Sequence, residues 1–147
     1  MQIVDGKPYI QQIKELIIEY TKRLVCDLIL ITNKTIDKKY TAPEGELLVA
    51  VEGEDVLGMI AYHRHSDTRC EMKRLYVKPS CRGMKLGEKL IEELIAHARQ
   101  AGYKEMVLDT IVPLQSAIHM YKKPGFAECE PYYHNPMPDV LYFRKEL

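Results

Sequence analysis

The stretch from Cys70 to Ala96 constrains this chain most, because it reads as a strand, a short turn and an amphipathic helix in direct succession. The helix places apolar residues on one face, namely Leu86, Leu90, Ile91, Leu94, Ile95 and Ala98. The first N–H groups of a helix lack partners within it, and the helix dipole adds positive charge there, so this end suits phosphate groups. Arg82, in the turn with Gly83 and Gly87, can donate two parallel hydrogen bonds to phosphate oxygens. The junction therefore predicts a pyrophosphate site, with a plain strand–helix connection as the alternative.

A second motif lies downstream, where a predicted strand at 105–110 leads into a short helix. The helix reads Ser116-Ala-Ile-His-Met-Tyr121, and Lys122-Lys-Pro-Gly-Phe126 closes it. Neither common nucleotide-binding pattern is present, since the sequence contains no G-x-x-x-x-G-K-[ST] and no G-x-G-x-x-G. If this chain binds a nucleotide-like ligand, it does so with a different arrangement.

With these two motifs in this order, the chain resembles the GNAT superfamily of N-acetyltransferases, which use acetyl-CoA. The family signature is a strand ending in apolar-x-Val, then [Arg/Gln]-x-x-Gly-x-[Gly/Ala] at the start of a helix, and later Ala-x-x-x-Tyr-x-x-x-Gly-Phe. Here the three parts are Leu75-Tyr76-Val77, Arg82 to Gly87, and Ala117, Tyr121 and Gly125-Phe126. The matching core runs from residue 46 to the C-terminus.

Two positions depart from the family pattern. Lys85 stands at the middle glycine of the phosphate turn. We expect it in the first helical turn, where a side chain is sterically acceptable and an ammonium favours nearby phosphate. Leu114 stands where the family often has an Asn that touches the pantetheine arm, and Gln115 is the neighbouring residue that could replace it.

The resemblance implies an α+β fold with a mixed, mostly antiparallel twisted sheet of about six to seven strands, about four flanking helices and a splayed parallel pair in the middle. The residue pattern agrees, because the helix between the strands at 69–77 and 105–110 makes a crossover that requires parallel strands. Other strands are predicted at 47–51, 56–63, 126–133 and 140–144, and an N-terminal helix carries Ile10, Ile13, Leu16, Ile17, Tyr20 and Leu24 on one face. The apolar run 25–31 fits a buried helix or a strand.

Length and charge limit the classes of function. A chain of 147 residues predicts a single domain, 1–147. The 21 Lys and Arg residues balance the 21 Asp and Glu residues, so no general field for polyanions is expected and nucleic acid is disfavoured as a partner. A homodimer is compatible with the sequence.

The cellular setting is predicted from what the sequence lacks. No apolar run approaches the ~20 residues of a membrane span, and the N-terminus does not resemble a signal peptide. The four cysteines, Cys26, Cys70, Cys81 and Cys129, have no CxxC spacing. We therefore expect no metal site, no membrane, free thiols and a cytoplasmic protein.

The resemblance assigns the acetyl-CoA site. In GNAT proteins the pantetheine pairs with the strand that here ends at Leu75, Tyr76 and Val77, so their amides are predicted donors, one of them with an oxyanion role. The alternative is that these amides only pair within the sheet. The pyrophosphate is expected on the phosphate-turn segment, whose residues are Arg82, Gly83, Met84, Lys85, Leu86, Gly87 and Glu88.

The catalytic candidates follow from the same resemblance and from side-chain chemistry. The motif tyrosine, Tyr121, is the predicted acid for the departing CoA thiolate, with simple packing as the alternative. Glu71 is the first candidate for the base, acting directly or by positioning a water, and strand alternation puts it on one face with Lys73 and Leu75. An ordinary strand carboxylate paired with Arg69 or Lys73 is its alternative. Asp109 is the second candidate, and the third choices are His119 and His134.

The acceptor is expected on the side opposite CoA, against the N-terminal helices and the last hairpin. Residues that could line its site are Tyr20, Tyr40, Tyr132, Tyr133, His134 and Asn135. The predicted activity is direct transfer of acetyl to a primary amine of a small molecule or amino acid, without a covalent acyl-enzyme. The alternatives are acetylation of a protein N-terminus or lysine, and a non-catalytic acyl-CoA-binding domain.

Overall fold

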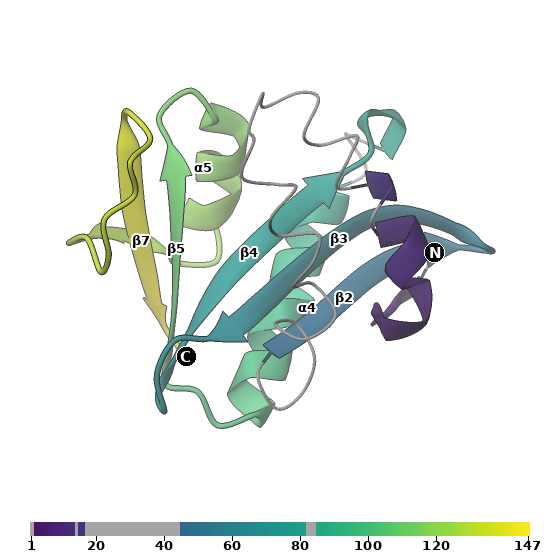
Figure 1. Ribbon diagram of the computed structural model, residues 1–147, viewed down its shortest axis with the longest axis horizontal. Helices are drawn as coiled ribbons and strands as arrows, with labels where there is room; N and C mark the ends of the chain where they lie inside the picture. Colours follow the sequence, from purple (N-terminus) through teal and green to yellow (C-terminus); the bar gives the residue numbers. More distant parts are fainter. Residues whose placement is uncertain (1, 14, 17–44, 82–84) are drawn as a thin grey trace.

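A seven-stranded sheet forms the centre of the computed structural model, which describes residues 2–13, 15–16, 45–81 and 85–147 (Figure 1). The strand order is β1-β2-β3-β4-β5-β7-β6, and β4–β5 is the parallel pair among antiparallel neighbours. The strands are β1 Gln2–Asp5, β2 Gly45–Glu52, β3 Asp55–Arg64, β4 Arg69–Val77, β5 Glu105–Ile111, β6 Ala127–Cys129 and β7 Val140–Glu146. The mixed α+β fold predicted from the sequence is confirmed.

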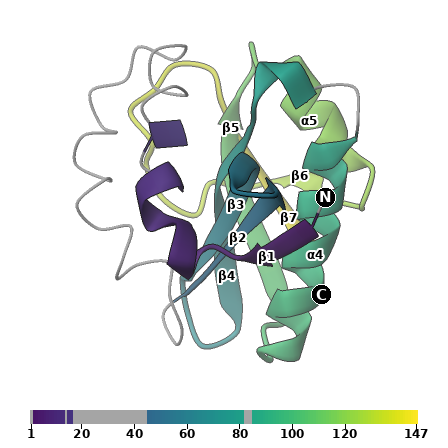
Figure 2. The ribbon, with the colours of Figure 1, turned by 90° about the vertical axis from the view of Figure 1, so that its right-hand side faces the viewer.

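Helices cover both faces of this sheet. Helix α4, Leu86–Gln100, and helix α5, Gln115–Lys122, lie on one face, and the helical residues 10–13 and 15–16 lie on the other (Figure 2). Two short 3-10 helices are η1, Lys7–Tyr9, and η2, Pro79–Cys81. Predictions for residues 17–44, including Tyr20, Tyr40 and the run 25–31, lie outside the described residues, as do those for Arg82, Gly83 and Met84.

The sheet separates two apolar clusters. On the α4 side, the predicted stripe of α4 packs with residues such as Met72, Leu108 and Phe143, all at most 5% exposed. On the other side, Ile13 and Leu16 pack on β2, β3 and Tyr76. Side chains that point to this second face beyond the reach of Ile13 and Leu16 are largely polar, and they form the candidate site.

The parallel pair separates after a short paired region. Its registered partners are Arg69 with Glu105, Cys70 with Met106, and Glu71 with Val107, whereas β4 continues to Val77 and β5 to Ile111. Backbone groups of β4 beyond Glu71 therefore have no β5 partner. This is the splay that the family resemblance implies.

A bulge in β4 changes the face of its last residues. Opposite β3, Lys73 pairs with Ala61 and Tyr76 with Met59, so Arg74 and Leu75 together face Ile60. Arg74 has a φ of +65°, which is unusual for a residue other than glycine. Leu75 consequently packs on the α4-side cluster and Tyr76 on the opposite one. The prediction that Leu75 shares a face with Glu71 is wrong, because the extra residue breaks the alternation.

Two further differences concern the sheet edges. The predicted strand at 126–133 is only Ala127–Cys129, because Pro131 lacks the N–H that a ladder requires. β1 was not predicted, and it adds an edge strand to β2. Gly102, with a φ of +94°, follows α4 as the predicted C-terminal glycine.

Candidate functional site

Two carboxylates and one ammonium meet where β4 and β5 separate. Lys73 Nζ lies 3.3 Å from Glu71 Oε2 and 3.1 Å from Asp109 Oδ1. Lys73 and Glu71 share a face of β4, and Asp109 projects from β5 toward them. The structure thus brings together the two residues predicted as candidate bases, with a lysine between them.

Glu71 is only 5% exposed, and its carboxylate has three partners among the described residues. His63 Nε2 lies 2.7 Å from Oε1, the Tyr132 hydroxyl donates to Oε2, and Lys73 completes the set. Burial by itself raises the pKa of Glu71, but the hydrogen bond from His63, the Lys73 charge and the Tyr132 hydroxyl outweigh it and lower that pKa to about 2. Glu71 is therefore anionic at neutral pH.

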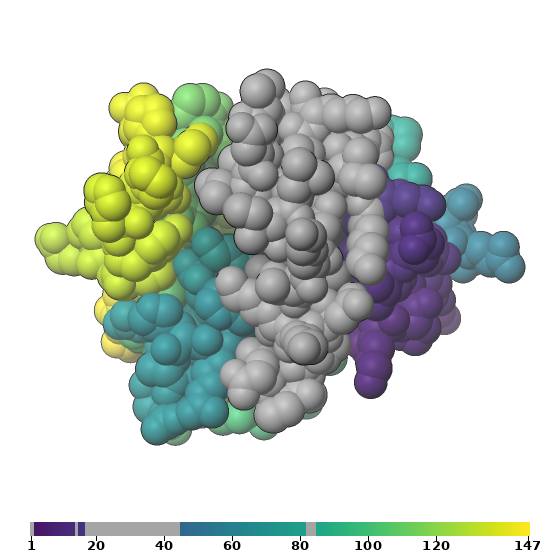
Figure 3. All heavy atoms as spheres, viewed as in Figure 1, coloured from purple at the N-terminus to yellow at the C-terminus, as the bar shows by residue number. Residues whose placement is uncertain are grey.

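The Asp109 carboxylate has its own partners from the segment between β6 and β7. The Tyr133 hydroxyl donates to Oδ2, and Asn135 Nδ2 lies 2.6 Å from the same oxygen. The Tyr142 hydroxyl donates to the Tyr133 carbonyl oxygen at 2.8 Å and accepts from the Asn135 amide at 3.2 Å. This segment is thus fastened to the sheet by polar contacts at the site (Figure 3 shows it adjoining the β3–β4 turn).

Lys73, Tyr132 and Tyr133 keep their protons. Burial lowers the pKa of Lys73, but the Glu71 and Asp109 carboxylates outweigh burial and raise it. Burial and the neighbouring carboxylates raise the pKa of Tyr132 and of Tyr133. At neutral pH, Lys73 is therefore a cation, and both phenols are hydrogen-bond donors.

The phosphate-turn segment is described from Lys85 onward. Lys85 is the N-cap of α4 in the left-handed conformation, with φ +56° and ψ +27°, and it makes no side-chain capping bond. The expectation that it lies in the first helical turn is wrong, because the helix begins one residue later, at Leu86. The first N–H groups of α4 thus lack a cap from Lys85, as an anion site requires. Glu88 in this turn is neutralised by Lys123, whose Nζ lies 2.6 Å away.

Gly87 is also a packing requirement. A Cβ at this position would lie 2.8 Å from the Met120 sulfur of α5 and 3.8 Å from Val77. Replacing Gly87 would consequently disturb the contact between α4 and α5 as well as any bound phosphate. A change in CoA affinity in a Gly87 variant could therefore not be assigned to the phosphate contact alone.

The splayed end of β4 fits an extended acyl-CoA arm. Its backbone lacks a β5 partner beyond Glu71, and Arg74 Nε is buried without a hydrogen-bond partner among the described residues. Unpaired strand amides suit the amide-bearing pantetheine. Leu75 and Val77 are half-buried at this end, and Tyr76 is 3% exposed.

Tyr121 lies within the α4-side apolar cluster. Its side chain is 8% exposed, and its ring packs against Phe126 with the centroids 6.4 Å apart. The packing holds the ring firmly, as a positioned acid or a core residue would need. Its catalytic role stays a prediction.

Sequence reasoning missed His63. Its ring pairs with Glu71 across the β3–β4 turn, and the register of two predicted neighbouring strands could have found it. Tyr132 and Asn135 were predicted only as lining residues, although their side chains contact the candidate bases. The third choices, His119 and His134, are exposed. The alternative role predicted for Glu71 was an ion pair with Arg69 or Lys73. The ion pair with Lys73 is present, whereas Arg69 pairs with Glu105.

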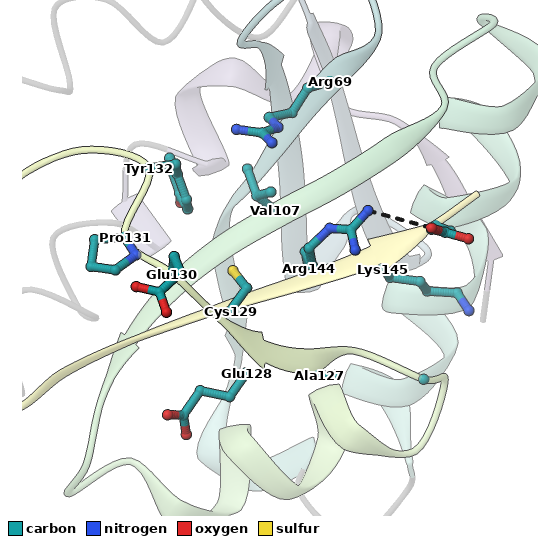
Figure 4. Close-up of a pocket in the computed structure, with 12 residues that line it drawn as sticks. Arg69, Val107, Ala127, Glu128, Cys129, Glu130, Pro131, Tyr132, Arg144 and Lys145 are labelled. Atoms are coloured by element: carbon teal, nitrogen blue, oxygen red, sulfur yellow. Dashed lines mark ion pairs between the residues drawn. The ribbon is translucent and has the colours of Figure 1, made fainter.

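A cleft of about 1010 Å³ adjoins the cluster on the β5–β7–β6 side. In Figure 4, Val107 lies between Arg69 and Cys129, with Arg69 and Tyr132 toward one end of the lining and Glu128 toward the other. The Arg69 and Arg144 guanidiniums both contact Glu105, and Arg144 also lies 3.5 Å from Glu146. Tyr132 belongs to both the cleft and the Glu71 environment.

The described residues form neither a metal-binding group nor a membrane-spanning helix. Within residues 2–13, 15–16, 45–81 and 85–147, no three His, Cys, Asp or Glu side chains gather closely enough to hold a metal ion. In the same part of the chain, no helix has the length and apolarity needed to cross a membrane.

Comparison with known proteins gives consistent matches. A model described as "Acetyltransferase (GNAT) family" matches residues 11–126. An uncharacterized N-acetyltransferase of Schizosaccharomyces pombe is 43% identical over 143 residues, covering 91% of this chain and 86% of that protein. The structure of an acetyltransferase from Streptococcus agalactiae superposes with a TM-score of 0.84 and 26% identity, covering 99% of this chain and 98% of that one. A GNAT acetyltransferase from Elizabethkingia anophelis with acetyl-CoA bound gives a TM-score of 0.65 and 22% identity over 84% of this chain and 87% of that one, a likeness of fold.

Proposed function

The chain belongs to the GNAT family of acetyltransferases and is an N-acetyltransferase, and on this premise we propose that it moves the acetyl group of acetyl-CoA to a primary amine of a small molecule or amino acid. The observation that carries the proposal is the Glu71–Lys73–Asp109 cluster at the splay of β4 and β5. It places anionic groups beside the opening where an acyl-CoA arm would pair. An amine that attacks a thioester gains positive charge, which these carboxylates would stabilise.

The donor is proposed to lie along the unpaired end of β4. The amides of Leu75, Tyr76 and Val77 would bind its pantetheine, and the turn at Arg82 to Glu88 would bind its pyrophosphate. The start of α4, where Lys85 makes no side-chain capping bond, supports the second contact, and the Lys85 ammonium adds positive charge there. Acetyl-CoA supplies the activated acyl group, and the chain's own residues orient it and handle the protons.

The lowered pKa of Glu71 favours one of its two predicted roles. A carboxylate with a pKa of about 2 is a weak acceptor for a proton from an alkyl ammonium. It is better suited to orient a water and to stabilise the positive charge on the attacking nitrogen. We therefore propose that Glu71 positions a water through which the amine loses its proton to solvent, with Asp109 as the second carboxylate. Tyr121 is proposed to protonate the departing thiolate.

The cleft favours a small acceptor over a protein. Its volume of about 1010 Å³ lies near the upper end of small-ligand sites, and acidic and basic side chains line it in equal number. A strongly acidic groove, which would favour a lysine-rich protein, is not what the described residues form here. A small amine or amino acid would fit between Tyr132 and Val107 with its nitrogen toward Glu71.

A panel of amines tests the activity. Purified protein is mixed with acetyl-CoA and each amine, and thiol release is followed together with the mass of the acetylated product. The proposal expects release that depends on the amine, with a product heavier by one acetyl group. Binding of CoA without turnover of any small amine, peptide N-terminus or lysine would instead support the non-catalytic alternative. Turnover confined to peptides would move the acceptor to the protein class.

A further inference from the structure

Side chains from two other parts of the fold hold the Glu71 carboxylate from opposite ends. His63 of β3 contacts Oε1 at 2.7 Å, and Tyr132, from the segment after β6, donates to Oε2. Lys73 Nζ lies 3.3 Å from Oε2. A carboxylate offers about four lone-pair positions, so these three contacts leave about one for a water or an amine.

We propose that Tyr132 and His63 are positioning residues for acetyl transfer, which fix the plane of the Glu71 carboxylate and with it the direction of its remaining lone pair, on Oε1. The inference rests on the proposed function, because the role of Glu71 in the reaction is itself proposed. Neither residue needs to touch the reacting atoms. Both act through Glu71.

The backbone and a second hydrogen bond fix the His63 ring. His63 and Glu71 are registered partners across β3 and β4, so their side chains leave the same face of the sheet. His63 Nδ1 lies 3.0 Å from the Arg64 carbonyl oxygen, while Nε2 faces Glu71. Both partners are acceptors, so a protonated ring donates to both of them and a neutral ring donates to one. In either form, rotation of the ring would move Nε2 away from Glu71.

Ring packing fixes Tyr132. Its ring meets His65 and Tyr142 edge-on, with centroids 5.4 Å and 5.3 Å away, and it lies 5.2 Å from the ring of Tyr133. Tyr132 also lines the cleft of about 1010 Å³. An acceptor that fills the cleft would therefore press on the residue that holds Glu71, which links acceptor binding to the position of the carboxylate.

Among the residues that the structure describes, four charged or titratable groups act on Glu71. His63 faces it from β3, Lys73 from β4 and Tyr132 from the segment after β6, and Asp109 of β5 acts through Lys73. Removing the Tyr132 hydroxyl leaves the other two contacts, so Glu71 stays anionic at neutral pH. The Glu71 carboxylate loses one of the hydrogen bonds that set its orientation, and its pKa rises.

Three variants test the proposal. Tyr132→Phe removes the hydroxyl and keeps the ring, and His63→Gln keeps a donor that His63→Ala removes. Tyr103→Phe is the matched control, because its ring packs 5.6 Å from Tyr62 in the α4-side cluster. The measurements are kcat on the best amine, KM for acetyl-CoA, and the titration of the Glu71 side-chain carboxyl carbon by NMR, with Glu71→Gln assigning the signal.

The expected results distinguish a misplaced Glu71 carboxylate from a damaged fold. Tyr132→Phe and His63→Ala should lower kcat by about 10- to 100-fold, the effect of a small misplacement at a reacting group, with KM for acetyl-CoA unchanged. His63→Gln should retain more activity than His63→Ala, and Tyr103→Phe should match the wild type. In Tyr132→Phe the Glu71 carboxyl should titrate at a higher pH.

Each contrary outcome has a distinct meaning. If Glu71 titrates at the same pH with and without the Tyr132 hydroxyl, the contact does not exist in solution and the proposal fails. If the titration moves but kcat on an accepted amine does not, the positioning role fails. If the titration moves and the wild type acetylates no amine, the contact between Tyr132 and Glu71 stands, the positioning role is overturned and the proposed function fails with it.

Discussion

Lys73 Nζ lies 3.1 Å from Asp109 Oδ1 and joins a strand to its parallel neighbour beyond the point where their backbones separate. The same ammonium lies 3.3 Å from Glu71 Oε2, so one cation serves two largely buried carboxylates. A side chain thus bridges the strands where backbone hydrogen bonds cannot. This bridge leads to the first of four predictions.

Lys73→Met should strongly destabilise the fold. The change leaves Glu71 and Asp109 close together without the cation between them, and a broken buried ion pair costs about 3–5 kcal/mol. Urea unfolding at neutral pH would measure the loss. The double variant Lys73→Met, Asp109→Asn should recover part of it, while Lys89→Met at an exposed position should have little effect. A Lys73→Met protein as stable as the wild type would show that the bridge contributes nothing.

Glu71→Gln should reduce turnover more than Asp109→Asn does. Each change keeps the shape of its side chain and removes the charge that stabilises the attacking nitrogen, but Glu71 is the residue held by both Tyr132 and His63. We expect kcat to fall by roughly 10²–10⁴-fold in Glu71→Gln, with KM for acetyl-CoA nearly unchanged. The reverse order of the two variants would assign the leading role to Asp109.

Tyr121→Phe should slow the reaction while leaving the fold intact. The variant keeps the ring that packs on Phe126 and removes the proton donor, so turnover should fall by roughly 10²-fold, the lower end for a positioned acid. The lower end is expected because a thiolate leaves readily with only partial protonation. Single-turnover kinetics at saturating acetyl-CoA would measure the chemical step. An unchanged rate there would reduce Tyr121 to a packing residue.

Acid should remove the stabilisation that Glu71 provides. Its pKa is lowered from 4.5 to about 2 in the folded chain, so the contribution is complete above pH 4.5 and is lost as the pH falls from 4.5 toward 2. The difference in unfolding free energy between the wild type and Glu71→Gln should therefore be largest above pH 4.5, at most about 3 kcal/mol, and shrink below it. Glu128→Gln, at an exposed position, is the control. A difference that is constant from pH 6 to 2.5 would contradict the lowered pKa.

The sequence predicts the parts of this protein that rest on local periodicity. The apolar stripe of α4 and the bounds of β4 at Arg69 and Val77 agree with the structure. The bulge was not predictable, because Arg74 carries none of the glycine signal that usually marks a positive φ. Lys85, which occupies a left-handed conformation at a helix start, did carry a signal, because the family pattern has a glycine at this position.

In the candidate site, too, some residues could be predicted from the sequence and others could not. Glu71 and Asp109 could be selected by residue type and by their place on the strands. Their partners His63, Tyr132 and Asn135 come from segments that only strand pairing and the course of the β6–β7 connection bring close. Pro131 did carry a usable signal, since it ends β6 and frees the residues after it to reach the sheet.

The bulge at Arg74 means that β4 has one residue more than its pairing with β3 needs. Arg74 and Leu75 both lie opposite Ile60, so a chain without Arg74 could pair Leu75 alone with Ile60. Lys73 would still face Ala61, Tyr76 would still face Met59, and each side chain would keep its present face. The loss of one residue earlier in β4 would instead move every later side chain to the opposite face of the sheet. In an alignment of relatives, a single gap at Arg74 is therefore compatible with this site, whereas a gap at Met72 would identify chains that have lost it.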